Sequence, residues 1–402
     1  MIGNPINIGN KERIAIIAKG SGFSHSFSAC NTKSYYIAKI LQEYGQRALI
    51  LSSIYYQEKP ILKKIGKYKG VLFYAPSCHT KTQSKIIKAI NKFSYTWKVI
   101  AFLISTRLKF GKSYYIFDDN SIFLPFLIIL SWFSVVELIF NIEEWPAAQS
   151  MPFRKKIVAH LFVLSALKAS GKIVCVSSFL IGKAIKYSDK SKLFKLPSIT
   201  AFSKSITNVP LVNNHHDLYS SFLYCGNVGY YEVIDTIISA FNDLTQSRKN
   251  FKLKLVLILS GDSLLMQKIS DRVEHIDSSI KIITNLTDSE LREEYAKATC
   301  LLAPLRNSIQ DQARFPQKIS EYASMSKPII TTKVGDIDLY FESDKSALLV
   351  DSFSAREIQR KMEYVIDNLD YVCKIGIEGN VVGRKYFDYK AYVSSFGRFI
   401  TS

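Results

Sequence analysis

Short runs of β-branched and other apolar residues alternate with helical patterns along the whole chain. Residues 13–18 (RIAIIA) predict a first strand, and residues 32–44 predict a helix that ends at Gly45. The run at residues 253–259 (LKLVLIL) is almost entirely apolar, which is typical of a parallel strand buried on both faces. This alternation predicts an α/β fold built from doubly wound parallel sheets.

The predicted strands fall into two series. The first comprises residues 13–18, 47–51, 70–74, 113–117, 135–142 and 172–176, and the second comprises residues 221–225, 253–259, 281–284, 300–303, 328–332 and 347–350. Residues 196–216 separate the series and predict a linker, because they are rich in Ser, Asn, Thr and Pro. A chain of 402 residues is long enough for two domains. We expect domains at residues 1–205 and 206–385, with a terminal helix in residues 386–402 that packs back on the first domain.

The net charge of +19 is unevenly distributed. Residues 1–205 contain 30 basic and 9 acidic side chains, whereas residues 206–402 contain 23 basic and 25 acidic ones. Thirteen Lys or Arg and no acidic residue lie between positions 59 and 117. Such a field attracts nucleic acid, an anionic lipid surface or a phosphorylated substrate, and charge alone does not choose among them.

Composition argues against several classes of protein. Hydrophobic residues make up 48% of the chain and charged residues 22%, which is typical of a globular protein and not of a disordered one. The six cysteines show no CxxC spacing, so neither a disulfide framework nor a structural zinc site is predicted. Residues 121–136 are uncharged and mostly apolar, but a membrane span needs about 20 residues. They predict a buried helix followed by a strand.

Residues 304–335 (PLRNSIQDQARFPQKISEYASMSKPIITTKVG) are the most informative segment. Pro316 suits the first turn of a helix, where its missing N–H is not needed. The N-terminus of a helix that points into a cleft binds phosphate through its free N–H groups and its dipole. Arg314 and Lys318 would add charged hydrogen bonds to such a phosphate, and Glu321 is an acceptor suited to paired sugar hydroxyls. The segment predicts a site for a base, a ribose and a diphosphate.

The same segment resembles the GT-B glycosyltransferases of the large retaining class called family 4, in the variant found in bacterial surface-polysaccharide members. The FPxKxxEY pattern begins at Phe315, and Glu321 matches the second glutamate of the family signature. Residues 327–330 (KPII) match the strand that follows, and Gly335 matches the next loop. Residues 224–232 (YCGNVGYYE) match the first strand and glycine loop of the family's donor domain.

The resemblance implies a GT-B fold of two Rossmann-like domains and a nucleotide-sugar donor, linked to UDP or GDP, with no metal or other cofactor required. In the family, the second glutamate holds the ribose of the donor. The donor-binding residues that the resemblance implies are Gly226, Asn227, Arg314, Phe315, Lys318, Glu321 and Gly335.

Two positions depart from the family pattern. The first signature glutamate, which lies against the donor sugar in the family, is Ala313 in this chain. Its contact is expected to move to a backbone N–H or to Asp311. Tyr231 and Glu232 stand where the family often has an Arg and a Lys for the diphosphate. The charge is then expected to come from Arg314, Lys318 or Arg306.

The acceptor side is predicted from residues that follow strands of the first domain. Glycosyl transfer needs a group near the reacting hydroxyl to accept its proton. Asp119 and Glu144 are the candidates for this catalytic base, and the alternative is that each caps the helix that follows it. Gly20, Gly22 and His25 lie in the first glycine-containing loop and are expected on the acceptor side.

Residues 84–97 (SKIIKAINKFSYTW) predict a basic amphipathic helix. Apolar residues, among them Trp97, form one stripe, and Lys85, Lys88 and Lys92 lie towards the other side. This pattern is typical of a helix that lies on an anionic membrane surface. The alternative is an ordinary surface helix that packs on the sheet.

The sequence therefore predicts a cytoplasmic enzyme attached peripherally to the inner face of the plasma membrane. The resemblance implies that it would transfer a sugar to a lipid-linked or growing glycan acceptor of the cell envelope, and no nucleic-acid partner is expected. The alternative is a non-catalytic GT-B-like protein, or a basic protein that binds nucleic acid or another anion, although no motif for nucleic-acid binding is present. A dinucleotide-dependent enzyme is disfavoured because residues 20–25 do not complete a GxGxxG pattern.

Overall fold

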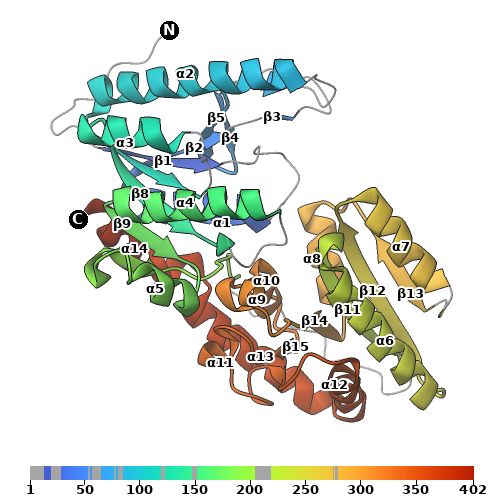
Figure 1. Cartoon of the computed structure of the whole chain (residues 1–402). Helices are drawn as coiled ribbons and strands as arrows, with labels where there is room; N and C mark the ends of the chain where they lie inside the picture. The colour runs from blue at the N-terminus through green and yellow to red at the C-terminus, as the bar shows by residue number, and fades with distance from the viewer. Residues whose placement is uncertain are drawn as a thin grey trace, which may run out of the picture. The chain divides into compact units, whose positions relative to one another are not determined.

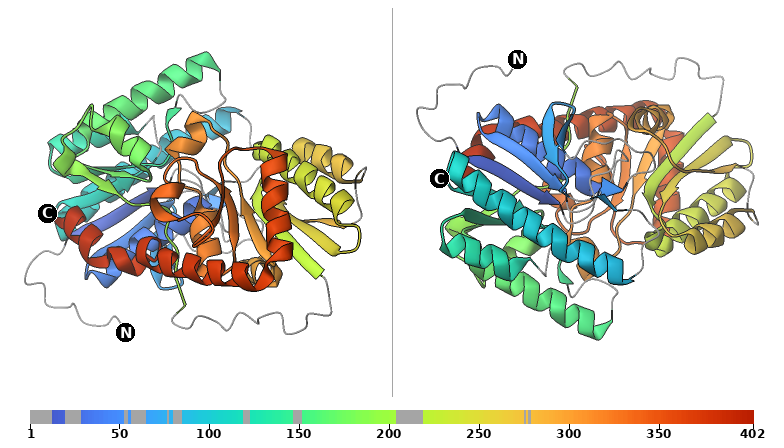
Figure 2. Two further views of the ribbon diagram at one scale, coloured as in Figure 1. Left: turned by 90° about the horizontal axis from the view of Figure 1, so that it is seen from below. Right: turned by 90° about the horizontal axis from the view of Figure 1, so that it is seen from above.

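The computed structural model describes residues 13–19, 29–52, 55–56, 65–76, 78–79, 85–118, 123–146, 152–203, 219–274, 276 and 279–402. The chain forms two compact units, each with its own parallel sheet (Figures 1 and 2). Unit 1 comprises Met1–Val176, Leu180–Leu196 and Tyr392–Ser402, and unit 2 comprises Ser177–Phe179 and Pro197–Ala391. The domain boundary expected between residues 205 and 206 lies outside the described residues.

The sheet of unit 1 has the strand order β10-β9-β8-β7-β1-β2-β5-β4. Its strands are β1 (Ile14–Lys19), β2 (Arg47–Ser52), β4 (Ile65–Tyr68), β5 (Val71–Tyr74), β7 (Ser113–Phe117), β8 (Val136–Ile142), β9 (Lys172–Cys175) and β10 (Leu193–Lys195). All neighbours pair in parallel except β4, which forms a hairpin with β5 through Lys69 and Gly70, both at positive φ. The strands predicted in the first series are confirmed, and β4 was not predicted. Outside this sheet, β3 (Tyr55–Tyr56) and β6 (Cys78–His79) pair with each other.

Helices cover the sheet of unit 1. They are α1 (Ala29–Glu43), α2 (Lys85–Phe110), α3 (Leu124–Trp132), α4 (Phe153–Ala169), the short α5 (Ser178–Ala184), which begins in unit 2, and α14 (Val393–Thr401). Gly45 follows the end of helix α1, and its φ of +95° is the left-handed conformation expected just after a helix C-terminus. Helix α2 is longer than the predicted helix at residues 84–97, since it continues to Phe110.

The C-terminal helix α14 is part of unit 1 (Figure 1). It packs on α1, where the backbone at Gly397 lies so close to the Tyr44 ring that a Cβ atom would overlap it. At its end, the buried Lys172 donates a hydrogen bond from Nζ to the carbonyl oxygen of Ile400 at 2.8 Å. The last ten residues therefore complete the fold of the unit that the first residues begin.

The sheet of unit 2 is entirely parallel, with the strand order β13-β12-β11-β14-β15-β16. Its strands are β11 (Tyr219–Asn227), β12 (Lys252–Ser260), β13 (Ile280–Ile283), β14 (Cys300–Ala303), β15 (Ile329–Thr332) and β16 (Leu348–Val350). Its helices are α6 (Tyr231–Ser247), α7 (Ser263–Glu274), α8 (Asp288–Lys297), α9 (Ile309–Ala313), α10 (Gln317–Ser324), α11 (Ile337–Tyr340), α12 (Ala355–Asp367) and α13 (Leu369–Tyr386). The second series of predicted strands is confirmed.

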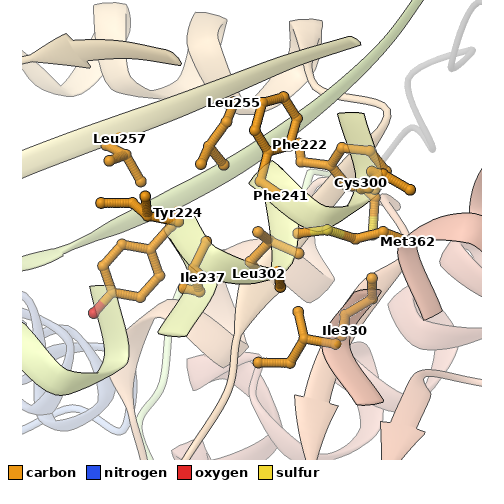
Figure 3. Packing of buried hydrophobic residues seen from close by; sticks show 14 of the residues in the cluster. Phe222, Tyr224, Ile237, Phe241, Leu255, Leu257, Cys300, Leu302, Ile330 and Met362 are labelled. Carbon is orange, nitrogen blue, oxygen red and sulfur yellow. The ribbon is translucent and has the colours of Figure 1, made fainter. Parts of the chain in front are cut away.

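The core of unit 2 forms where the helices meet these strands. Figure 3 shows Phe222 and Leu255, from neighbouring strands, packed with Ile237 and Phe241 of α6. Most of β12 is buried, as the apolar run at residues 253–259 predicts. Because the strands are anchored in this core, their carboxyl ends can hold loops in fixed positions.

Three segments differ from the sequence-based expectation. Residues 121–136 contain a helix and the start of a strand as predicted, but α3 is buried on one side only. Part of the expected linker, residues 197–203, packs into unit 2, where Ile199 is fully buried. The polar loop after Pro304 contains the short helix α9. Among the residues that the structure describes, no helix combines the length and hydropathy needed to cross a bilayer.

Candidate active site

The carboxyl end of β11 turns directly into helix α6. Gly226 and Asn227 are the last residues of the strand, and the side chain of Asn227 accepts a hydrogen bond from the N–H of Gly229 at 2.8 Å. A Cβ atom at Gly226 would lie 2.4 Å from the hydroxyl oxygen of Tyr224. The side chain of Tyr224 would therefore have to shift to admit a larger residue at position 226.

Helix α10 places Lys318 against this turn. Pro316 is the N-cap of α10, and no side chain caps the helix. The ammonium group of Lys318 donates a hydrogen bond to the carbonyl oxygen of Cys225 and lies 4.3 Å from the centre of the Tyr224 ring. Burial lowers the pKa of Lys318. The structure thus brings together two residues predicted from separate motifs, Gly226 and Lys318.

Glu321 lies one turn further along α10. Burial raises the pKa of its carboxyl group to about 7, although the positive charges of Arg292 and Lys318 act in the opposite direction. The hydroxyl group of Tyr295, on α8, lies 3.5 Å from one carboxylate oxygen. The next residue, Tyr322, accepts a hydrogen bond from the N–H of Cys225 at 3.1 Å, which fixes α10 against β11. Glu321 is therefore a half-buried carboxylate that lies near Lys318 on a helix fixed against β11.

Two arginines are held by one buried aspartate. Asp311, on α9, is fully buried, and its Oδ2 atom accepts hydrogen bonds from the backbone N–H and Nε of Arg306, both at 2.9 Å. Its Oδ1 atom lies 2.6 Å from a guanidinium nitrogen of Arg314. Both carboxylate oxygens are thus occupied, so Asp311 is placed to position the arginines and not to contact a sugar.

The ring of Tyr230 lies against the same two arginines. The guanidinium carbon of Arg314 is 4.1 Å from the ring centre, and that of Arg306 is 5.6 Å away. The buried Nε of Arg314 has no hydrogen-bond partner within the described part of the chain. The result is a pair of oriented cations beside the N-terminus of α6, which could bind a dianion.

Glu232 and Tyr231, at the start of α6, each lie beside a cation. The carboxylate of Glu232 lies 3.4 Å from a guanidinium nitrogen of Arg306. The ring of Tyr231 lies 4.1 Å from the ammonium nitrogen of Lys268, on α7. Positive charge is therefore present at this end of the sheet, although it comes from other segments of the chain.

Three further positions have structural contacts. Ala313 is fully buried, and its carbonyl oxygen accepts a hydrogen bond from the hydroxyl group of Ser177 at 2.5 Å. Phe315 is buried between the rings of Tyr340 and Phe387, so it would act on a donor only by anchoring α10. Gly335 has a φ of +66°, and a Cβ atom there would lie 3.2 Å from the carbonyl oxygen of residue 312.

The acceptor-side candidates are less completely described. Asp119, Gly20, Gly22 and His25 lie outside the described residues, whereas Glu144 follows β8 and is half-buried. Of the expected membrane residues, Trp97 is exposed on α2. Lys85, Lys88 and Lys92 also belong to α2, but their side chains are outside the described part.

One charged pair of unit 1 was not identified from the sequence. Lys33, which is almost completely buried on α1, lies 3.2 Å from a carboxylate oxygen of Glu143. The same oxygen accepts a hydrogen bond from the side-chain amide of Asn141 at 2.9 Å. The sequence signal that could have identified this pair is Lys33 itself, a lysine on the apolar side of an amphipathic helix. Across the described residues, no group of three or more His, Cys, Asp or Glu side chains could hold a metal ion.

Comparisons with known proteins show which family and which fold this chain resembles. Residues 220–368 match the family described as glycosyl transferases group 1. The chain is also 22% identical over 240 residues to an uncharacterised glycosyltransferase of Methanocaldococcus jannaschii. That similarity covers 60% of this chain and 62% of the relative, so it spans less than two thirds of the relative's length.

Solved structures resemble the whole chain. Sucrose-phosphate synthase from Thermosynechococcus elongatus has a TM-score of 0.75 at 12% identity, with 97% of this chain and 98% of that chain covered. The α,α-trehalose-phosphate synthase of Burkholderia xenovorans has a TM-score of 0.68 at 12% identity, with 97% and 100% covered. HepE of Anabaena in complex with UDP-glucose has a TM-score of 0.63 at 12% identity, with 96% and 98% covered. The predicted GT-B fold is confirmed.

Proposed function

We propose that this protein is a retaining glycosyltransferase of family 4 that moves a sugar from a nucleotide-sugar donor to a glycan acceptor. The observation that carries the proposal is the arrangement of Lys318 and Glu321 on α10 beside the turn at Gly226. A half-buried carboxylate next to a lysine and free helix N–H groups suits a ribose joined to a diphosphate. The family match covers this part of the chain.

Unit 2 is the proposed donor-binding unit. Glu321 would accept hydrogen bonds from the ribose hydroxyls, and Lys318 with Arg314 would contact the diphosphate. As the bond to the sugar breaks, negative charge grows on the leaving diphosphate, and cations already fixed in place stabilise it. These groups belong to the chain itself, so the proposal requires no metal. Asp119 and Glu144 remain the candidates to accept the proton of the acceptor hydroxyl.

Unit 1 is the proposed acceptor-binding unit. Its excess of basic side chains suits an acceptor that carries phosphate, such as a glycan linked to a lipid pyrophosphate at a membrane surface. This would place the protein peripherally on the inner face of the plasma membrane, in the assembly of a cell-envelope polysaccharide such as capsule or lipopolysaccharide. Nucleic acid is not a proposed partner.

A panel of nucleotide sugars tests the proposed donor. Thermal unfolding is measured with UDP- and GDP-linked sugars, because HepE, which shares the fold, was solved with UDP-glucose. A donor at about 100 times its Kd should raise the melting temperature by roughly 5 to 10 °C. If no nucleotide sugar of either class changes the melting temperature, the non-catalytic alternative is favoured.

Donor binding should strengthen as the pH rises. The pKa of Glu321 is raised to about 7, so its carboxyl group is mostly protonated at pH 6 and ionised at pH 8. Only the ionised form accepts hydrogen bonds at both oxygens, so the Kd for a nucleotide sugar should fall about tenfold between pH 6 and pH 8. Titration calorimetry measures this. Glu321→Gln is the control, and an equally steep profile in that variant would assign the pH dependence to another group.

A further inference from the structure

Helix α3 is apolar on both sides. Leu124, Leu127 and Leu130 are buried in unit 1, where α3 packs on β8. The opposite side is exposed and consists of Pro125, Phe126, Ile129, Trp132 and the C-cap residue Phe133. Trp132 and Phe133 are 78% and 76% exposed. A helix in contact with water normally presents polar residues on its outer side, and α3 has no charged residue at all.

Helix α4 repeats this arrangement. Val163, Ala166 and Leu167 are its buried residues. The exposed apolar residues of its first half are Phe153, Ile157, Val158 and Leu161, and Phe153 is 77% exposed. Arg154 and Lys155, which are also exposed, lie between them. The outer side of α4 therefore combines large apolar side chains with positive charge.

The exposed apolar residues of α3 and α4 lie on neighbouring helices of unit 1, and together we call them the apolar face. Helices α3 and α4 pack against each other, and α2 lies beside α3 (Figure 1). The ring of Trp97, on α2, lies 6.5 Å from the ring of Phe126, on α3. Large exposed apolar side chains on several neighbouring helices are uncommon on a soluble monomer and mark an interaction site.

The charge of the helices that carry the apolar face favours an anionic partner. Helix α2 contains six Lys or Arg and α4 contains four, whereas α2, α3 and α4 contain no acidic residue. A second copy of the chain on the same face would bring these like charges together, which disfavours a symmetric dimer. An anionic lipid surface offers opposite charge at the headgroups and an apolar layer beneath them.

We propose that the apolar face inserts into the interfacial layer of an anionic membrane, with Trp132, Phe133 and Phe153 as its deepest side chains. The basic residues of α2 and α4 would lie at the headgroups. The inference rests on the membrane contact of the proposed function, and it names α3 and α4 as the inserting elements in addition to the lysines of α2.

Vesicle sedimentation tests the proposal. The full chain is mixed with vesicles of phosphatidylglycerol and phosphatidylcholine, or of phosphatidylcholine alone. We expect binding to the anionic vesicles that weakens at high salt. The triple variant W132S/F133S/F153S should lower the partition coefficient at least tenfold. These side chains are mostly exposed, so the fold should be retained.

The matched control is L264S/L339S/V381S, which removes three exposed apolar side chains of unit 2. It should bind vesicles as the wild type does. Equal vesicle binding by the wild type and W132S/F133S/F153S would overturn the proposal. It would also be overturned if the wild type were a dimer by light scattering without vesicles and the variant a monomer.

Binding of UDP-glucose and of a GDP-linked sugar, measured without vesicles, separates this proposal from the proposed function. The triple variant should keep the nucleotide-sugar affinity of the wild type, because its substitutions lie in unit 1. Loss of vesicle binding with intact nucleotide-sugar binding supports the apolar face. Vesicle binding by a wild type that binds no nucleotide sugar would contradict the proposed donor and leave the apolar face supported.

Discussion

Replacement of Glu321 by alanine is expected to weaken nucleotide-sugar binding by roughly 150-fold or more. The carboxylate would accept hydrogen bonds from two ribose hydroxyls, and hydrogen bonds to a charged group contribute about 1.5–3 kcal/mol each. Partial burial has already removed some of the water around this carboxyl group, as the raised pKa of Glu321 indicates. Less water therefore has to leave when the ribose arrives. Titration calorimetry at about pH 8, where the carboxylate is ionised, measures the change in Kd.

Glu293→Ala is the matched control, since Glu293 is exposed on α8 in the same unit. It should bind donors as the wild type does. The melting temperature of Glu321→Ala without ligand should not fall, because removal of a half-buried carboxyl group whose pKa is raised relieves a desolvation cost. Unchanged donor affinity in a folded Glu321→Ala variant would falsify the proposed ribose contact.

Replacement of Asp311 by alanine should destabilise unit 2 and weaken donor binding together. The change leaves the guanidinium groups of Arg306 and Arg314 without the carboxylate that both contact. Removal of one partner from a buried ion pair costs about 3–5 kcal/mol. The partial exposure of the arginines favours the lower value, which corresponds to roughly 6 to 12 °C in melting temperature for a unit of this size.

Asp271→Ala removes an exposed aspartate of α7 and is the control for this experiment. Its melting temperature and donor affinity should match those of the wild type. Asp311→Asn keeps the shape of the side chain, so it should recover part of the stability while donor affinity stays low. If Asp311→Ala melted within about 2 °C of the wild type, the aspartate would not be the group that holds the arginine pair.

The parallel sheets could be predicted from sequence because burial imposes a simple pattern on their strands. A strand such as β12 is apolar along nearly its whole length, and this signal survives without any knowledge of its neighbours. Strand β4 (IGKY) was not predicted because it is short, contains Gly66, and pairs only at the edge of the sheet. Helix α9 was also missed, since five residues give no periodicity.

The candidate site could be predicted only in part. Lys318 and Glu321 are three residues apart in a predicted helix, so they lie about one turn apart on the same side of it. Their relative position therefore follows from the sequence. Arg306 and Arg314 both contact Asp311. These contacts depend on the conformation of a loop, which the helix and strand propensities of its residues do not specify. The exposed side of α3 is a similar case. An apolar run predicts a buried helix, and only the structure shows which side of it the core leaves uncovered.

The assignment of α14 to unit 1 has a consequence for biosynthesis. All of unit 2 after residue 196 is synthesised before residues 392–402. Until these residues are made, the ring of Tyr44 lacks its contact with α14, and Lys172 lacks the carbonyl of Ile400 as its acceptor. The unit whose translation begins first is therefore the unit whose last segment is synthesised last.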